Sequence, residues 1–277
     1  MSLNKSISII ISLLKYLDKD SIQETDIKFI KQQIDVLFYL LPLPNYFCIP
    51  NQLERLTINE RIKEVGNRRI SEIRHLKYPP TTTKYGRCNV LDNPVLYGSF
   101  NLFTILDEIK PETGKLLTHS IWKVKEGIKL KMCPIVFEDN DSNTLSSEIR
   151  KLHNDYISNL SYLIQETINL HISFFVKCFS KNVEELNHYD YFLSAYISYK
   201  IFNIHNANYD GIIYPSVGSN LNFSNMAIRP SAFDSKFEIV EVLHQQNQIE
   251  HNKNGLNVVI SRATKFDLEK GIIIWDN

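Results

Sequence analysis

The sequence has no excess of charge of either sign, no cysteine motif and no long apolar run. Lys plus Arg and Asp plus Glu both number 31 among 277 residues. This balance lacks the basic surplus that tight electrostatic binding to a nucleic-acid backbone requires. The four cysteines, at positions 48, 88, 133 and 178, form neither a CxxC pair nor the disulfide framework of a small secreted domain. We therefore expect reduced thiols and no nucleic-acid partner.

No stretch reaches the roughly 20 apolar residues that a membrane-spanning helix needs. The apolar run at residues 7–14 is short and leads into charged residues without a small-residue cleavage site, which is not the pattern of a signal peptide. The composition, 43% apolar and 22% charged, allows a sizeable core. These features predict a cytoplasmic protein without a membrane partner.

Helical spacing dominates the first fifty residues. Within residues 22–41 apolar side chains recur every three or four positions, which places them on one face of a helix. Residues 3–17 are predicted to form a second helix, and the Leu-Pro-Leu-Pro stretch at 41–44 ends the pair because proline cannot continue a helix. We place a domain boundary near Pro50, with an N-terminal helical hairpin at 1–50 and a catalytic domain at 51–277.

Beyond residue 50 the pattern changes to short β-branched and aromatic runs. The short link at 125–127 contains Gly127, which can take a positive φ, so we expect a β-hairpin between 116–124 and 128–133. A long helix is predicted over 149–178 and another over 189–202. Together with the predicted strands these helices indicate an α+β fold. The other expected strands are 95–97, 211–214, 225–228, 237–242, 256–261 and 271–275.

Three separated stretches combine turn residues with polar side chains. They are Tyr-Pro-Pro at 78–80 leading to Tyr-Gly-Arg-Cys-Asn at 85–89, Pro-Val-Leu-Tyr-Gly-Ser at 94–99 continuing to Glu108, and Tyr-Asp-Gly-Ile-Ile-Tyr-Pro-Ser at 209–216. Arg87 follows a glycine, so a backbone without a preceding side chain can bring its guanidinium close to a ligand. The donor fork of arginine suits a pyrophosphate.

Glu108 lies in a predicted helix at 102–109, between the apolar residues Ile105 and Ile109. If this helix packs on the sheet, the carboxylate is partly removed from water. A desolvated carboxylate stabilises a developing cation better than one in bulk solvent. Asp107 points about a quarter-turn away and is the less suitable of the two acidic side chains.

Taken together, these stretches resemble the RES-domain family, which is named for an Arg, a Glu and a Ser. The resemblance covers about residues 51–250 and includes Glu108 with the Lys-Pro that follows at 110–111. It implies an ADP-ribosyltransferase-like fold that consumes NAD⁺ as its substrate by hydrolysis, phosphorolysis or ADP-ribosyl transfer. Such proteins are often toxins of toxin-antitoxin systems, neutralised by an Xre-like antitoxin protein.

The resemblance also implies roles for individual residues. The family's first arginine has three candidates, of which we choose Arg55, on a predicted strand, over Arg68 and Arg69 in a loop. The other positions carried over are Arg87 at the Gly-Arg motif, Tyr97 as the pocket tyrosine, Glu108 as the glutamate, Ser216 as the serine, and Asn225 near the family's asparagine. Arg55 and Arg87 would then hold the pyrophosphate while the glutamate faces the ribose.

Simpler interpretations remain open for several of these residues. Tyr97 can equally be a core residue, Ser216 can be a turn residue after a proline, and Tyr85, Tyr209 and Tyr214 are expected to fill a core. The histidines lack metal-ligand spacing, and neither Gly-Ser pair has the flanking glycines of a nucleophile elbow. Two other functions also stay open: ADP-ribosylation of a protein target, and binding of a nucleotide or partner without turnover. The sequence does not decide whether the chain is a homo-oligomer.

Overall fold

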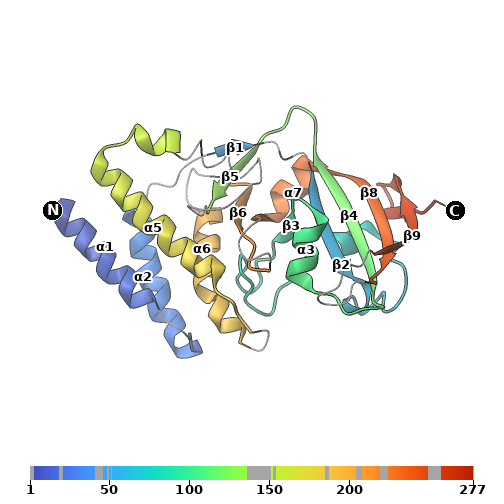
Figure 1. Cartoon of the computed structure of the whole chain (residues 1–277), viewed down its shortest axis with the longest axis horizontal. Coiled ribbons are helices and arrows are strands. Elements are labelled where there is room, and N and C mark those ends of the chain that lie inside the picture. Colours follow the sequence, from blue (N-terminus) through green and yellow to red (C-terminus); the bar gives the residue numbers. More distant parts are fainter. Residues whose placement is uncertain are drawn as a thin grey trace.

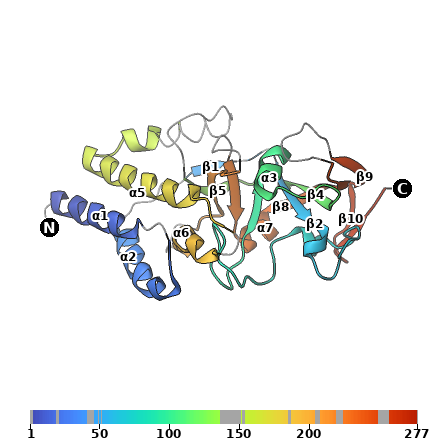
Figure 2. The ribbon, with the colours of Figure 1, turned by 60° about the horizontal axis from the view of Figure 1, so that its bottom comes forward.

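The protein is a mixed α+β fold built on one large sheet. The computed structural model describes residues 3–18, 21–40, 46–48, 50, 52–135, 151, 154–184, 187–203, 208–218, 224–248 and 257–276. Helix α1 (Leu3–Leu17) and strand β9 (Val258–Ala263) lie at opposite ends of the long axis, as two views show (Figures 1 and 2). The predicted α+β class is confirmed.

The large sheet has nine strands in the order β1-β5-β6-β7-β3-β2-β4-β8-β9. All neighbours pair antiparallel except β5 and β6, which are parallel. The bounds not yet given are β1 (Tyr46–Cys48), β2 (Leu53–Ile58), β3 (Leu96–Ser99), β4 (Leu116–Val124), β5 (Leu130–Pro134), β6 (Gly211–Pro215), β7 (Ser224–Ile228) and β8 (Phe237–Gln246). Every predicted strand is found, and 271–275 corresponds to β11 (Ile272–Ile274), which pairs with β10 (Lys265–Asp267) in a small second sheet.

The sheet is nearly divided in two between β2 and β3. These strands share one residue pair, Glu54 with Ser99, whereas β2 pairs with β4 along its whole length. Beyond Glu54 the edge of β2 that faces β3 is therefore unpaired. This split lies beside helix α3 (Leu102–Ile109), which follows β3 directly.

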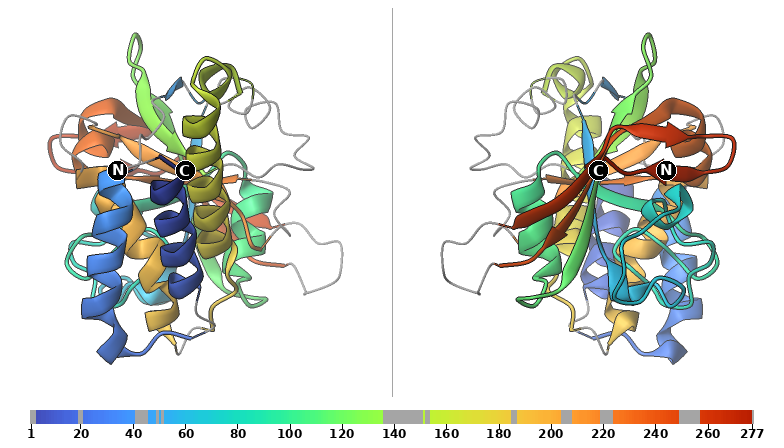
Figure 3. Two further views of the ribbon diagram at one scale, coloured as in Figure 1. Left: turned by 90° about the vertical axis from the view of Figure 1, so that its left-hand side faces the viewer. Right: turned by 90° about the vertical axis from the view of Figure 1, so that its right-hand side faces the viewer.

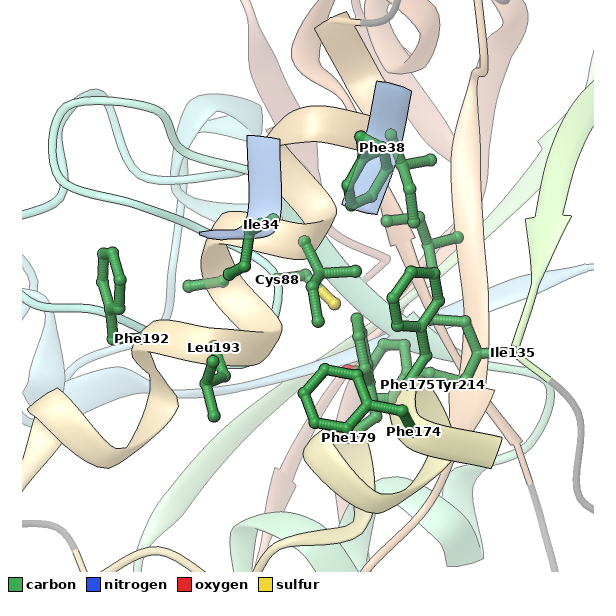
Figure 4. Close-up of a cluster of buried hydrophobic side chains, with 14 of the residues drawn as sticks. Ile34, Phe38, Cys88, Ile135, Phe174, Phe175, Phe179, Phe192, Leu193 and Tyr214 are labelled. Atoms are coloured by element: carbon green, nitrogen blue, oxygen red, sulfur yellow. The ribbon is translucent and has the colours of Figure 1, made fainter. Parts of the chain in front are cut away.

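Helices α1, α2 (Ile27–Leu40), α5 (Tyr162–Ser180) and α6 (Phe192–Asn203) gather at one end of the molecule, where α5 also contacts β6 (Figures 1 and 3). The stripe predicted for α2 is buried at Ile30, Ile34 and Leu37. These side chains share a core cluster with Phe175 and Phe179 of α5 and Tyr214 of β6, part of which Figure 4 shows. The predicted boundary near residue 50 therefore separates two parts of the chain, the first helices and the rest, whose side chains pack in the same hydrophobic core.

A second cluster packs on the opposite face of the sheet, where α7 (Pro230–Lys236) contributes Phe233 beside Trp122. The structure also contains four short 3₁₀ turns: η1 (Glu24–Asp26), η2 (Asn59–Arg61), η3 (Ile73–Leu76) and η4 (His188–Tyr191). No helix in the described ranges combines the length and apolarity that crossing a bilayer requires. The Leu-Pro-Leu-Pro stretch at 41–44 lies outside the described residues.

The predicted hairpin between 116–124 and 128–133 is wrong. Gly127 does take a positive φ of 75°, and Ile128 donates to the carbonyl of Lys125, so the tight turn itself is present. However, β4 pairs with β2 and β8, while β5 pairs with β1 and β6. Pairing with strands that are distant in sequence outcompetes the local hairpin between β4 and β5, because β4 and β8 pair along nearly their whole lengths.

The predicted helix over 149–178 is shorter and interrupted. Residues 154–158 are helical, the chain turns at 159–160, and α5 starts at Tyr162 after Ser161 as N-cap. The start of the predicted stripe, Ile149 and Leu152, lies outside the described residues. Apolar spacing persists across a break, so periodicity alone does not reveal it. The predicted helix over 189–202 is confirmed as η4 followed by α6.

Candidate active site

The carboxylate of Glu108 is the centre of the site. Its Oε1 accepts hydrogen bonds from Ser216 Oγ at 2.6 Å, Asn225 Nδ2 at 2.8 Å and the backbone N–H of Gly218 at 3.2 Å. All hydrogen bonds to this carboxylate from the described residues end on Oε1, so Oε2 is left for another partner. The side chain of Glu108 is half-buried, as expected for a helix that packs on the sheet, whereas the neighbouring Asp107 is exposed.

Helix α3 positions this carboxylate. Asn101 caps the helix by accepting from the backbone N–H of Thr104 at 3.0 Å, and the helix ends at Lys110 in a left-handed conformation with φ of 45°. Ile105 is buried against Leu56 of β2. The predicted packing of this helix on the sheet is therefore found, and Glu108 is held in its last turn.

The three donors come from β7 and from the segment that follows β6. Asn225 pairs with Ser99 on one side and Tyr214 on the other, so these side chains form a row across three strands. Ser216 comes directly after β6 and is fully buried. A Cβ on Gly218 would lie 2.4 Å from the carbonyl oxygen of Asp107, so only glycine lets this segment approach the last turn of α3.

The hydroxyl of Tyr97 is bound inside the protein. It accepts from the backbone N–H of Cys88 at 2.7 Å and donates to Asn89 Oδ1 at 2.9 Å. Burial raises the pKa of Tyr97 well above its ordinary value, so the hydroxyl stays protonated. Both bonds connect β3 to the Tyr-Gly-Arg-Cys-Asn stretch. This arrangement agrees with the simpler interpretation of Tyr97 as a core residue.

Arg87 points toward the segment between α5 and η4. Its Nη1 donates to the carbonyl oxygens of Phe179 and, at 3.1 Å, Lys181, and its guanidinium lies 5.1 Å from the ring centre of Tyr191. The structure gives a packing reason for glycine at the preceding position 86, because a Cβ on Gly86 would lie 2.3 Å from Asn89 Oδ1. Arg87 makes no hydrogen bond to Glu108 among the described contacts.

The charges of both Glu108 and Arg87 act on the hydroxyl of Tyr214. Burial raises the pKa of its hydroxyl well above the ordinary value, the Glu108 carboxylate raises it further, and the Arg87 guanidinium lowers it. Both charged groups are therefore within electrostatic range of one buried phenol. Tyr85, Tyr209 and Tyr214 are all buried in the first core cluster, as expected for packing residues.

Arg55 lies at the split in the sheet. Its Nη1 donates to the carbonyl oxygen of Tyr97 at 2.9 Å, across the gap from β2 to β3. Burial lowers the pKa of this guanidinium to about 10, which still leaves it charged at neutral pH. By contrast, Arg68 bonds to the carbonyls of Val65 and Glu64, and Arg69 lies 4.9 Å from the ring centre of Trp275.

Sequence reasoning gave no role to several residues that shape this site. Asn89 belongs to the Tyr-Gly-Arg-Cys-Asn motif, which assigns it no function, yet its Oδ1 accepts a hydrogen bond from the Tyr97 hydroxyl. Gly218 precedes Ser219 in a Gly-Ser pair that lacks the pattern of a nucleophile elbow, although its backbone N–H donates to Glu108. Tyr214 was expected only to pack. The signal was present at Gly218, because a glycine soon after a conspicuous motif often permits a close backbone approach.

The arrangement offers a fixed, half-buried carboxylate with one oxygen left for a reacting group. Within the described ranges, no three or more His, Cys, Asp or Glu side chains gather as a metal site would require. A search of protein-family models gave no match to this sequence, and a search of curated proteins gave no significant one.

Proposed function

We propose that the chain cleaves the N-glycosidic bond between nicotinamide and ribose in NAD⁺, with Glu108 as the catalytic carboxylate. The observation that carries the proposal is the convergence of Ser216, Asn225 and Gly218 on Oε1 of Glu108. Donors fixed on one oxygen hold the carboxylate in a single orientation before substrate binds. Such preorganisation is what electrostatic stabilisation of a transition state needs.

The chemistry suits one carboxylate. Glycosidic cleavage passes through an oxocarbenium-like state in which positive charge spreads over the ribose ring. Oε2 of Glu108 would face that ring and stabilise the charge. Nicotinamide departs as a neutral molecule, so no general acid has to protonate it. The acceptor of the ribosyl group would be water or phosphate.

The proposal also includes the specific fold, the NAD⁺-binding residues and the protein partner that the resemblance to the RES-domain family implies. An ADP-ribosyltransferase-like core of the RES type would hold NAD⁺, with Arg55 and Arg87 orienting the pyrophosphate and Tyr97 near the nicotinamide. A toxin with this activity would need an inhibitor, such as an Xre-like antitoxin. The helices α1 and α2 offer exposed apolar side chains for such a partner, including Tyr16 and Phe29.

The test measures nicotinamide released from NAD⁺ by the purified chain, with and without phosphate. We expect Glu108→Gln to fold normally and to lose turnover by roughly two to four orders of magnitude, because the amide carries no charge. Asp107→Asn makes the same change from carboxylate to amide at the exposed neighbouring residue and should retain turnover. Arg87→Ala should raise KM as well as lower kcat. This residue would bind the pyrophosphate of NAD⁺, whose charge hardly changes during the reaction.

Near-normal release by Glu108→Gln would overturn the proposal. Release that needs an added protein target would instead identify a dedicated ADP-ribosyltransferase. Dependence of the rate on phosphate, with ADP-ribose 1″-phosphate as the product, would separate phosphorolysis from hydrolysis.

A further inference from the structure

A cavity of about 730 Å³ lies where β2 separates from β3. Four consecutive β2 residues, 55–58, line it, which places it along an edge of the strand and not over one face. Because β4 occupies the other edge of β2, the cavity follows the edge left unpaired beyond the Glu54–Ser99 pair. Its remaining walls come from residues 61–64, 74–75 and 77–80, and from Ile109 at the end of α3.

The lining of this cavity is strongly basic. It contains five cationic side chains and a single carboxylate, that of Glu64. Arg74 already pairs with Glu64, and Lys77 pairs with Asp234. The cationic side chains are Arg55, Arg61, Lys63, Arg74 and Lys77. Arg61 and Lys63 form none of the ion pairs found within the described part of the chain, so their charges remain available to an anion.

Two buried polar atoms in the cavity wall have no hydrogen-bond partner among the described residues. They are Thr57 Oγ1 and Arg55 Nε, and the Thr57 residue is only 9% exposed. A buried donor without a partner costs about 1–3 kcal/mol, so native proteins rarely leave one without a ligand or water to bind it. Both atoms are donors that suit phosphate oxygens.

The cavity is connected to the candidate active site through two residues. Arg55 lines the cavity and also donates to the carbonyl of Tyr97, whose hydroxyl bonds to Asn89. Ile109 lines the cavity and directly follows Glu108 in the last turn of α3. A molecule that fills the cavity therefore ends next to the turn that carries the carboxylate.

We propose that this cavity binds the adenosine diphosphate half of the dinucleotide, with Thr57, Arg61 and Lys63 as phosphate-binding residues in addition to Arg55. The inference rests on the proposed function, since it assigns the second half of the same substrate. The volume is in the range of cavities that enclose small-molecule ligands. The cationic lining selects a ligand with two phosphates over one with a single phosphate or none.

The experiment measures binding of ADP, AMP and adenosine to the full chain by titration calorimetry. ADP should bind at least about tenfold more tightly than AMP, and adenosine weakest, because each phosphate adds charge-assisted hydrogen bonds. The double variant Arg61→Ala/Lys63→Ala should weaken ADP binding at least about tenfold. A control that removes the same charge elsewhere, Lys129→Ala/Lys265→Ala, should bind ADP within about twofold of wild type.

Thr57→Val tests the buried hydroxyl separately, because valine keeps the shape and removes the donor; we expect about fivefold weaker ADP binding. No ADP binding by wild type, or equal binding by wild type and the double variant, would overturn the inference. Nicotinamide release with an unchanged KM in the double variant would also overturn it and leave the proposed function intact. Conversely, variant-sensitive ADP binding by a chain that releases no nicotinamide would support this site and refute the NAD⁺ chemistry.

Discussion

Ser216 Oγ donates a hydrogen bond of 2.6 Å to Glu108 Oε1, although 108 positions separate the two residues. The bond joins the segment after β6 to the last turn of α3, the two stretches that carry the most conspicuous motifs. It gives Ser216 a definite partner within the site, where the sequence left a turn role open. The consequences of this contact can be measured.

Ser216→Ala should reduce kcat for nicotinamide release by roughly 10- to 100-fold, because a hydrogen bond to a charged group contributes about 1.5–3 kcal/mol. KM should change little, since the serine holds the carboxylate and not the substrate. Ser198→Ala is the matched control: Ser198 is equally buried but bonds to the carbonyl of Ser194 in α6. Equal kcat values in Ser216→Ala and the control would contradict the assigned role.

Asn225→Asp should change the pH dependence of the reaction. Nδ2 of Asn225 lies 2.8 Å from Oε1 of Glu108, so the substitution places two carboxyl groups at hydrogen-bond distance. Like charges this close disfavour double ionisation and raise the pKa of one member of the pair. The acid limb of the kcat/KM profile should therefore move to higher pH, whereas Asn225→Ala should lower activity without that movement. Superimposable profiles for wild type and Asn225→Asp would refute the geometry.

Gly218→Ala should impair activity through packing. The added Cβ would meet backbone atoms of Asp107 and Glu108 within 2.8 Å, and backbone cannot move aside as a flexible side chain can. We expect a loss of about 1–3 kcal/mol in the free energy of unfolding together with a marked fall in kcat.

Gly127→Ala provides the contrast for that variant. Gly127 has a φ of 75° with open space around it, and it lies in the turn between β4 and β5, outside α3 and the segments that bond to Glu108. Alanine there should cost about 1–2 kcal/mol of stability through the left-handed backbone, while kcat per folded molecule stays normal. Similar kcat losses in both glycine variants would indicate general destabilisation and not a specific contact.

His171 should make the protein less stable in mild acid. Burial lowers the pKa of this fully buried imidazole below its ordinary value of 6.5, and Nδ1 donates to the carbonyl of Thr167 at 2.7 Å. Below pH 6.5 the unfolded chain binds a proton that the folded chain does not, so the free energy of unfolding falls as pH decreases and is restored above that pH. Thermal melts between pH 7.5 and 5.5 measure this dependence.

His171→Leu should reduce the slope of Tm against pH in this interval without abolishing it. His244, whose pKa is also lowered by burial, retains its own contribution in that variant. An unchanged slope in His171→Leu would show that the imidazole is protonated equally in the folded and unfolded chain.

The sequence by itself determined the candidate residues and most of the local elements, although not the break at 159–160 that precedes α5. Apolar spacing every three or four positions marks α2, and alternation with turn residues marks the strands, because these signals depend on neighbours along the chain. The same holds for α3, where the apolar residues Ile105 and Ile109 on either side of Glu108 predict a helix that packs on the sheet.

Only the tertiary structure decided which elements meet. The turn at Gly127 was recognisable, yet β4 and β5 find partners elsewhere, because strand pairing is settled by long-range competition along whole strands. The direction of Arg87 toward Phe179, the bonds of Ser216 and Asn225 to Glu108, and the cavity at the split beside Arg55 all join segments distant in sequence. Such contacts depend on the folded arrangement of the whole sheet, which no local pattern encodes.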